Sequence, residues 1–489
     1  MTDGPPPNTR VATEDGETVV YVTHKTADGE MVIKHAFPSA ISNHYQPAGI
    51  GEDIPLYAGT FQLASQLPTS FIGDVRFTWN PTPRVMARGG ANRSMLDDIL
   101  DGDDGPKWVR MGDVIVDTIN GIPTPPSTAN SSWNRDEANT WMEDRIATPS
   151  LGDGEDLDSV TFFVPNGWQS IGGSRIQDGA RPWIWWDGGL TSTAAEWQVT
   201  IHPTGRHSSE FWSELKSSGS SQVTHIGRLT RIDGARFSAD AAENPLNAIR
   251  LAISFALGRA VQCLLPVGWQ DSIPVWTMWH TGGIDRVKGV QSLLDQTIAP
   301  SQLEEMIGQC LVFAADPFKE EVLQYSVSYY LTANYDVNVE LAVALPISAL
   351  QLLAYYRFVE DRGTFSRGRW NDLTTGEQIR ELLSDCSIDL EIPVDFQHLE
   401  SVRTTLGLKQ DGSPRDALDC IIKMRNNVIH PTRDKPATWD PYQWSEASQV
   451  VLDYLRLAIL NLVGFNSSIR TAVQPSKHLG QTAKVPWAP

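Results

Sequence analysis

Residues 413–431 have the sequence SPRDALDCIIKMRNNVIHP, and this stretch determines how the C-terminal half of the chain is interpreted. Ser413 and Asp416 show the S-x-x-D spacing of a capping box, in which two side chains satisfy free backbone N–H groups at a helix start. Pro414 would then hold the first helical position, where a missing N–H is tolerated. The stretch therefore predicts a helix over residues 414–429, ended by the final proline, because proline disfavours helical geometry in the residue before it.

The apolar side chains of this helix recur at helical spacing and form a stripe that should face a core. The stripe consists of Leu418, Ile421, Ile422, Val428 and Ile429. Arg425 lies on the stripe, where a guanidinium is costly unless it is paired or used. Asn426 and His430 are four residues apart on a neighbouring face, with His430 at the C-terminal end of the helix. An arginine, an amide and a histidine thus converge on one helix end.

At these residues the chain resembles the HEPN superfamily, whose signature is an R-N-x-x-x-H motif near the end of a core helix. Arg425–His430 reads RNNVIH and fits this motif in full. An apolar stretch suited to a helix, Val339–Tyr356, lies upstream, and a long predicted helix, Tyr442–Leu462, follows directly. The resemblance covers about residues 300–465 and implies an all-α HEPN helical bundle there.

The N-terminal half has a different composition. Of the 17 tryptophans, 13 precede residue 280, and turn signals such as Asn166-Gly167 and Asp187-Gly188 are frequent there. Short alternating or β-branched stretches lie between the turns, among them residues 18–22, 75–79, 114–116 and 197–201. Short strands at such spacing predict an antiparallel, β-rich sandwich or barrel.

These patterns together predict an α+β multidomain protein. Residues 1–280 are assigned to a β-rich sensor or regulatory domain, which includes a helix near 246–260, beginning at Asn244-Pro245, and a hairpin near 263–280. The helical domain is assigned to residues 281–465, and residues 466–489 to a polar, loosely held tail. Helices are predicted near residues 287–296, 301–314, 317–332, 338–359, 375–385, 397–407, 414–429 and 442–463. A β-rich half before a C-terminal HEPN domain is similar to the arrangement of ApeA-type anti-phage abortive-infection proteins.

Three clustered tryptophans stand out in the β-rich half. On a strand, Trp183 and Trp185 would share one face, while Trp186 would point to the other. Exposed, the paired indoles could hold a sugar ring or a base. Core packing is favoured, because a domain so rich in tryptophan must bury most of it.

The charge balance limits the partners. With 39 basic and 59 acidic residues among 489, the chain has a net charge of −20, so contact with nucleic acid requires a local basic patch. The window Arg403–Lys435 provides one, with seven basic residues against four acidic ones. Within it, Lys423, Arg433 and Lys435 are the candidate RNA-binding residues, although ordinary solvated lysines and arginines on a surface helix would give the same pattern.

Several classes of site and location have no support in the sequence. Phosphate-binding loops, dinucleotide fingerprints, nucleophile elbows and zinc-protease motifs are absent, and the four cysteines are widely spaced. We therefore expect no cofactor and no metal. The first residues lack an apolar segment, and the longest near-apolar run, Leu341–Tyr356, suits a buried helix better than a membrane span. The expected location is cytoplasmic, without membrane association.

The HEPN resemblance implies a metal-independent endoribonuclease, acting as a regulated toxin in anti-phage abortive infection. The RNA 2′-OH would attack the adjacent phosphorus, leaving a 2′,3′-cyclic phosphate and a 5′-OH. His430 would act as general base or acid, Arg425 would hold the phosphate, and Asn426 would orient either group. Because positions 425 and 430 are about 140° apart around a helix, we expect a homodimer that builds one cleft from two motif helices. RNA is the implied substrate, tRNA being one candidate, and a phage-derived molecule is one candidate for a trigger at the N-terminal domain.

Two other interpretations stay open. The helical domain could be a catalytically inert HEPN dimerisation or nucleotide-binding scaffold, in which Arg425 pairs with a carboxylate across the interface. The β-rich half could instead be a carbohydrate-binding domain that uses Trp183 and Trp185, although it shows no recognisable catalytic carboxylate pair.

Overall fold

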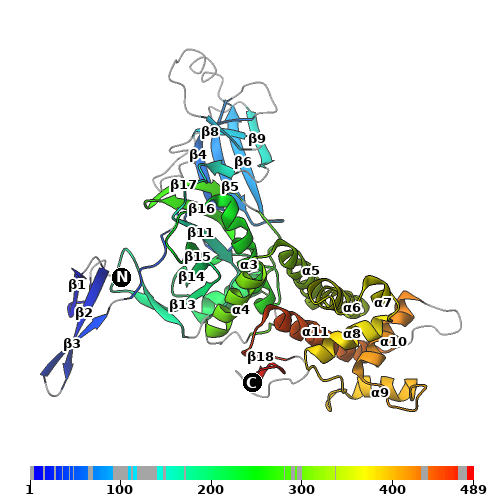
Figure 1. The fold of residues 1–489 in the computed structure, drawn as a ribbon. Helices are drawn as coiled ribbons and strands as arrows, with labels where there is room; N and C mark the ends of the chain where they lie inside the picture. Colours follow the sequence, from blue (N-terminus) through cyan, green and yellow to red (C-terminus); the bar gives the residue numbers. More distant parts are fainter. Residues whose placement is uncertain are drawn as a thin grey trace. The chain divides into compact units, whose positions relative to one another are not determined.

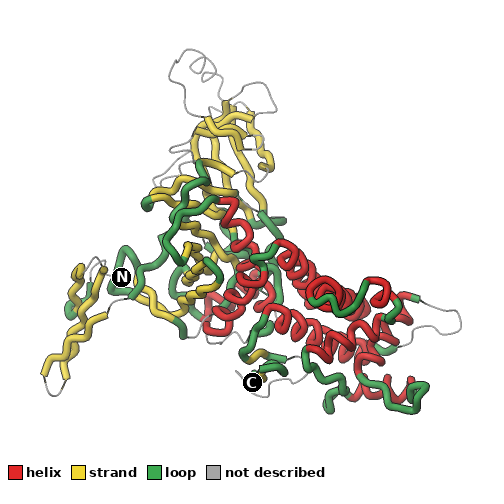
Figure 2. Tube along the Cα trace, in the orientation of Figure 1, coloured by secondary structure: helices red, strands yellow, loops and turns green. Residues whose placement is uncertain are grey.

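The chain, in its computed structural model, divides into two compact units. The structure describes residues 5–14, 17–26, 29–35, 37–42, 44–47, 49–63, 70–91, 108–111, 114–117, 140–146, 150–169, 172–279, 281–287, 292–294, 300–335, 337–430, 439–471 and 482–488. The first unit comprises Met1–Leu246, Val261–Lys288 and Ala299–Ser301, and the second comprises Asn247–Ala260, Gly289–Ile298 and Gln302–Pro489. The first is β-rich and the second is mainly helical, which confirms the predicted α+β multidomain class (Figures 1 and 2).

The described strands of the first unit form three antiparallel sheets. The smallest contains β1 (Thr9–Glu14), β2 (Glu17–Thr26) and β3 (Gly29–His35). A six-stranded sheet has the order β7-β8-β4-β5-β6-β9 and consists of β4 (Ile54–Leu63), β5 (Ser70–Thr78), β6 (Arg84–Ala91), β7 (Trp108–Met111), β8 (Val114–Asp117) and β9 (Thr140–Ile146). An eight-stranded sheet has the order β10-β17-β16-β11-β15-β14-β13-β12 and consists of β10 (Ser150–Gly152), β11 (Ser159–Pro165), β12 (Ser174–Gln177), β13 (Trp185–Ala194), β14 (Trp197–Pro203), β15 (Val223–Arg231), β16 (Leu264–Gln270) and β17 (Ile273–Met278).

The two larger sheets share one apolar core. It includes Ile54, Leu56, Val75, Phe77 and Val85 from the six-stranded sheet and Phe163, Val223, Ile226, Leu264 and Val267 from the eight-stranded sheet. Tyr45 and Trp279 are fully buried in this core, and the indole N–H of Trp279 donates to the Tyr45 hydroxyl at 2.8 Å. Burial raises the pKa of Tyr45 to about 12, so its hydroxyl stays neutral and needs no charged partner.

One glycine allows two strands of the eight-stranded sheet to pack around an aromatic ring. Gly227 on β15 lies opposite Phe162 on β11 in the strand register. A Cβ atom at Gly227 would overlap the Phe162 ring, which is itself only 1% exposed. The ring therefore occupies the space that a side chain at position 227 would need.

The second unit contains most of the helices. The helices among the described residues are α2 (Ser209–Ser218), α3 (Ala239–Leu257), α4 (Pro300–Phe313), α5 (Pro317–Asn334), α6 (Val339–Tyr355), the π-helical η1 (Tyr356–Asp361), α7 (Arg367–Asn371), α8 (Thr375–Asp385), α9 (Gln397–Leu406), α10 (Ala417–Ile429) and α11 (Pro441–Val463). Helix α6 lies at the centre, where it contacts α5, α8, α10 and α11. A short ladder, β18 (Ser468–Ile469) with β19 (Ala483–Lys484), follows α11.

Six of the predicted helices occur at nearly the predicted positions, as α4, α5, α6 with η1, α8, α9 and α11. The sequence does not predict α2 or the five-residue α7. The helix predicted near 287–296 falls largely outside the described residues, and its described part, residues 287 and 292–294, is not helical. Long periodic segments are thus predicted well and short ones are missed.

Helix α3 differs from its prediction both in where it starts and in which of the two units it belongs to. It begins at Ala239 and not at Pro245, because Ser238 caps it: the Ser238 hydroxyl accepts from the Ala241 N–H at 3.2 Å. Pro245 consequently lies inside the helix. From Asn247 onward the helix belongs to the helical unit and not to the β-rich domain to which the sequence assigns it.

The described part of the C-terminal tail, residues 466–471 and 482–488, is also more ordered than predicted. Ile469 and Val485 are buried, and the indole N–H of Trp487 donates to the Phe465 carbonyl at 2.8 Å. The average composition of a polar segment does not reveal a few scattered apolar residues. Here those residues are enough to pack this part of the tail against the helical unit.

In the described part of the chain, Val339–Asp361 is long and apolar enough to cross a bilayer by length and composition. The side chains of Val343, Ile347, Leu350 and Leu353 are nevertheless buried in the helical unit. That burial matches the core helix that the sequence predicts here.

The clustered tryptophans are not core residues. Trp183 lies in the turn before β13, while Trp185 and Trp186 begin the strand, and all three are only partly buried. The core packing favoured for them is therefore wrong. Other indoles fill the interior of the β-rich unit instead, namely Trp79, Trp197, Trp276 and Trp279.

We predict that Gly227→Ala destabilises the β-rich unit by about 1–3 kcal/mol, since the added methyl group overpacks the site against Phe162. Urea unfolding followed by tryptophan fluorescence measures this, because 13 of the 17 tryptophans precede residue 280. Gly179→Ala is the matched control, since a Cβ there meets nothing within 4 Å. Adding Phe162→Leu should recover part of the loss, whereas a Gly227→Ala protein as stable as the wild type would contradict this packing.

Candidate functional site

Helix α10, which carries the R-N-x-x-x-H motif, starts one turn later than predicted. Its N-cap is Asp416, whose side chain accepts from the Asp419 N–H at 2.9 Å, while the Asp419 side chain accepts from the Asp416 N–H at 3.2 Å. Ser413 does not cap the helix; its N–H and hydroxyl both donate to the Asp411 carboxylate, at 2.9 and 2.7 Å. The predicted start at Pro414 is therefore wrong, because a second capping box, Asp416 with Asp419, takes the place of the first.

The capping carboxylates are held by cations from two other segments. Arg380 of α8 donates through Nη2 to Asp416 at 3.2 Å and to Asp419 at 3.0 Å, and Lys409 Nζ lies 2.6 Å from Asp419. Burial alone would raise the pKa of Asp416, but the hydrogen bonds from Arg380 and from the Asp419 N–H outweigh burial and lower it. The start of the motif helix is thus an ionised cap bound to α8.

The predicted apolar stripe holds only in the first turns of α10. Ala417, Leu418, Cys420, Ile421 and Met424 are buried in the helical unit. Val428 and Ile429, by contrast, are 40% and 42% exposed. The last turn of the helix therefore presents two apolar side chains to solvent beside the motif.

The three predicted catalytic residues lie along the second half of this helix and at its end. Arg425 is half-buried, its Nη1 donates to the Asn426 side-chain oxygen at 3.1 Å, and its buried Nε has no hydrogen-bond partner among the described residues. His430 is exposed and ends the helix with φ −125° and ψ 66°, while its N–H still donates to the Asn426 carbonyl at 2.9 Å. The structure brings Arg425 and Asn426 into contact, and among the described residues no hydrogen bond joins the His430 imidazole to either.

The basic residues of the window around the motif are not equivalent. Lys423 is exposed, whereas Arg403 is paired with Glu400 at 2.7 Å and Lys409 is paired with Asp419. Arg433 and Lys435, the other two predicted RNA-binding residues, lie outside the described residues. Counting charges along the sequence overstates the free positive charge, because Glu400 lies outside the counted window and neutralises an arginine within it.

Potential metal ligands do not gather anywhere in the described ranges: no group of three or more His, Cys, Asp or Glu side chains there could hold a metal ion. The four cysteines, all within the described residues, are buried and form no disulfide.

Two segments of the chain match described protein families. Residues 152–290 match the YopA central domain, and residues 316–482 match the YopA C-terminal domain. The chain is similar to YopA. The first match covers most of the eight-stranded sheet, and the second contains α10 and α11 entirely. Neither description names HEPN proteins, so the HEPN resemblance rests on the motif and its helical setting.

One relative of the chain is the SPbeta prophage-derived uncharacterized protein YopA of Bacillus subtilis (strain 168). It is 26% identical to this chain over 294 residues, which are 60% of this chain and 64% of that protein. The chain thus spans less than two thirds of the length of this relative. No solved structure matches the chain.

We predict that Asp416→Ala loosens the motif helix, because it removes a cap and leaves Arg380 half-buried without its main partner. Amide hydrogen exchange across α10 should be about 5- to 30-fold faster, the equivalent of about 1–2 kcal/mol. Asp416→Asn, which keeps a capping side chain but not the charge, should show an intermediate effect. Glu381→Gln, an exposed change on α8, should leave exchange unchanged; equal rates in Asp416→Ala and the wild type would refute the anchoring role.

The ionisation of Asp416 also predicts how the stability of the chain depends on pH. The pKa of Asp416 is lowered in the folded chain, so its contribution to stability is complete above the ordinary Asp pKa of about 4 and is lost as the pH falls through the lower folded value. The difference in urea midpoint between the wild type and Asp416→Ala should therefore be constant from pH 6 to 8 and shrink below about pH 4. A difference that grows in acid would contradict this assignment.

Proposed function

We propose that this chain is a metal-independent endoribonuclease of HEPN type that acts as a regulated toxin in anti-phage defence. One observation carries the proposal: Arg425, Asn426 and His430 lie at the solvent-facing end of a helix whose start is anchored by Arg380. Catalytic residues need accessible side chains on a rigid support, and this helix end provides both.

The chemistry requires little from the protein, since RNA supplies its own nucleophile. The 2′-oxygen forms a bond to the adjacent phosphorus, the bond from phosphorus to the 5′-oxygen breaks, and the products are a 2′,3′-cyclic phosphate and a 5′-OH. His430, exposed at the helix end, takes the 2′-OH proton or protonates the departing 5′-oxygen. Arg425, oriented through its Nη1 bond to Asn426, stabilises the negative charge on phosphorus-bound oxygens.

A second copy of the chain completes the site in this proposal. Positions 425 and 430 diverge by about 140° around one helix, so a single helix presents them poorly to one phosphate. Val428 and Ile429 lie between them and are exposed, which suits an apolar contact with the same turn of a partner helix. Lys423, on the same helix and free of the ion pairs that bind Arg403 and Lys409, is the described cation best placed to attract the RNA backbone.

We predict that His430→Ala lowers RNA cleavage at least 100-fold and abolishes toxicity to growing cells, because it removes proton transfer. The assay uses end-labelled RNA in EDTA, with 2′,3′-cyclic ends identified by their resistance to phosphomonoesterase. RNA bearing a 2′-O-methyl group at the scissile position should resist. His398→Ala, which changes another exposed histidine of the helical unit, is the matched control. Undiminished cleavage by His430→Ala, or efficient cleavage of the methylated substrate, would exclude the mechanism.

We also predict that replacing both Val428 and Ile429 with serine converts a dimer into a monomer in sedimentation velocity at micromolar concentration. Cleavage should be lost together with the dimer, because the composite cleft no longer forms. Val394→Ser is the control, since Val394 is 96% exposed and lies far along the chain from the motif. A wild-type dimer that never cleaves RNA and is not toxic would favour the inert scaffold, and a wild-type monomer that cleaves would refute the composite site.

A further inference from the structure

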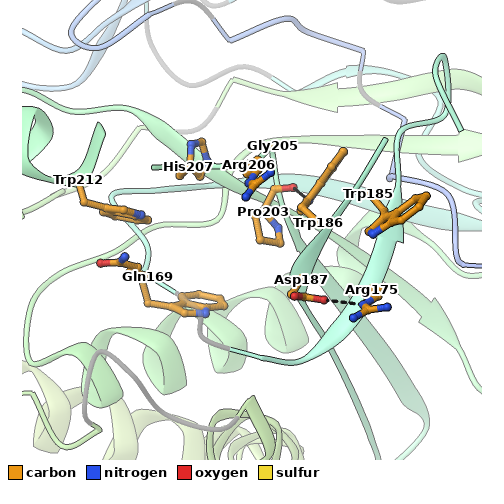
Figure 3. Close-up of a pocket in the computed structure, with 11 residues that line it drawn as sticks. Gln169, Arg175, Trp185, Trp186, Asp187, Pro203, Gly205, Arg206, His207 and Trp212 are labelled. Atoms are coloured by element: carbon orange, nitrogen blue, oxygen red, sulfur yellow. Dashed lines mark hydrogen bonds and ion pairs between the residues drawn. The ribbon is translucent and has the colours of Figure 1, made fainter. Parts of the chain in front are cut away.

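A second site lies in the β-rich unit and is unrelated to the motif helix. A pocket of about 310 Å³ opens beside the start of β13, and its walls come from β12, β13, the residues after β11 and the segment from the end of β14 into α2 (Figure 3). Its volume lies at the lower end of the range for small-molecule sites, about 300–1,000 Å³. The pocket can therefore hold one small ligand.

Four half-buried indoles line this pocket: Trp168, Trp185, Trp186 and Trp212. Each is held by a neighbour of its own. The Trp186 indole N–H donates to the Pro203 carbonyl at 3.2 Å. The other three pack on aromatic rings, with distances between ring centroids of 4.0 Å for Trp168 and His225, 5.1 Å for Trp185 and His35, and 5.6 Å for Trp212 and Phe211. Figure 3 shows Trp212 on one side of the site and Trp185 with Trp186 on the other. Aromatic rings fixed in this way lose little freedom on binding a flat ligand.

Adjacent residues of a strand ordinarily point to opposite faces, yet Trp185 and Trp186 both line the pocket. The pairing of β12 with β13 shifts register between Ser174 and Ile176, directly beside Trp186. Such an irregularity breaks the alternation of side chains and redirects them locally. The edge of the sheet is thus shaped so that both indoles serve one site.

The polar lining favours an anion. Arg175 and Asp187 form an ion pair with 3.1 Å between Nε and Oδ1, which leaves no unpaired carboxylate in the lining. Arg206 is exposed and has neither a hydrogen bond nor an ion pair among the described residues. Burial lowers the pKa of His207 despite its hydrogen bond to the Thr224 carbonyl, so its ring is neutral at pH 7. Two arginines against one aspartate give the pocket a local charge of +1 in a chain of net charge −20.

We propose that this pocket binds a nucleotide, with the base against the indoles and the phosphate on Arg206. Stacking on tryptophan is available to any base, and an unpaired guanidinium is a preferred phosphate ligand. A neutral sugar would leave Arg206 without a role, and a quaternary ammonium ion would meet a net positive lining. The ligand is either a free nucleotide or the terminal nucleotide of a nucleic-acid strand. Both present the same base and phosphate to the pocket. This inference does not depend on the ribonuclease proposal.

The test titrates the full chain with AMP, with adenosine and with inorganic phosphate, using tryptophan fluorescence and calorimetry. AMP should bind at least tenfold more tightly than either of the other two, because only AMP engages both halves of the site. A 5′-phosphorylated tri-deoxyadenylate separates the two sources: tighter binding than AMP assigns a strand end, and equal or weaker binding assigns a free nucleotide.

Paired variants assign the binding to this pocket. Arg206→Ala should weaken AMP at least tenfold while leaving adenosine unchanged, and Arg206→Lys should restore part of the loss. Trp185→Ala should weaken AMP and adenosine alike. Arg181→Ala and Trp183→Ala are the matched controls, because both residues lie just before β13 without lining the pocket. The proposal fails if AMP does not bind at millimolar concentration, if these variants leave its affinity unchanged, or if maltotriose or tetramethylammonium binds here in its place.

Discussion

The position of the motif helix depends on one partly buried electrostatic contact. Arg380 of α8 bridges Asp416 and Asp419, the two carboxylates that cap the start of α10. The cap lowers the cost of the unpaired N–H groups in the first turn, and the guanidinium ties that turn to a neighbouring helix. The start of α10 is thus held, its middle is buried through Leu418, Ile421 and Met424, and its last turn extends from this support into solvent.

That arrangement explains how a costly combination of residues is tolerated. Arg425 follows the buried part of α10, and the buried Nε atom of its guanidinium has no hydrogen-bond partner among the described residues. Beside it, Val428 and Ile429 remain exposed. A buried N–H without an acceptor reduces stability, and so does an apolar helix turn exposed to water. Destabilising features of this kind are most common at functional sites. The β-rich unit shows a related departure at Trp185 and Trp186, where an irregular sheet edge leaves the indoles only half-buried around a pocket.

The sequence predicted the long elements well, because hydrophobic periodicity over ten or more residues has few interpretations. Helices α4, α5, α6, α8, α9 and α11 follow from it. The hairpin of β16 and β17, whose strands are shorter, is indicated instead by the turn residues 270–272 between two apolar stretches. It misplaced the starts of α3 and α10, since each start has more than one residue able to cap a helix, Ser238 and Asn244 for α3 and Ser413 and Asp416 for α10, and only the folded backbone selects between them. The motif residues were identified from their order alone, whereas Arg206 was missed, because a single arginine in a loop carries no pattern.

The sequence by itself determined the α+β class, the succession of most helices, and the presence of arginine, asparagine and histidine at one helix end. These are properties of residues close together in the chain, which periodicity and local spacing report directly. Only the tertiary structure decided which carboxylate caps α10, that Val428 and Ile429 face solvent while Met424 does not, and that Trp185 and Trp186 line one pocket with Arg206. Each of those outcomes depends on contacts between segments that are distant in the chain. Such burial and charge pairing form only in the folded state, so a local sequence pattern does not predict them.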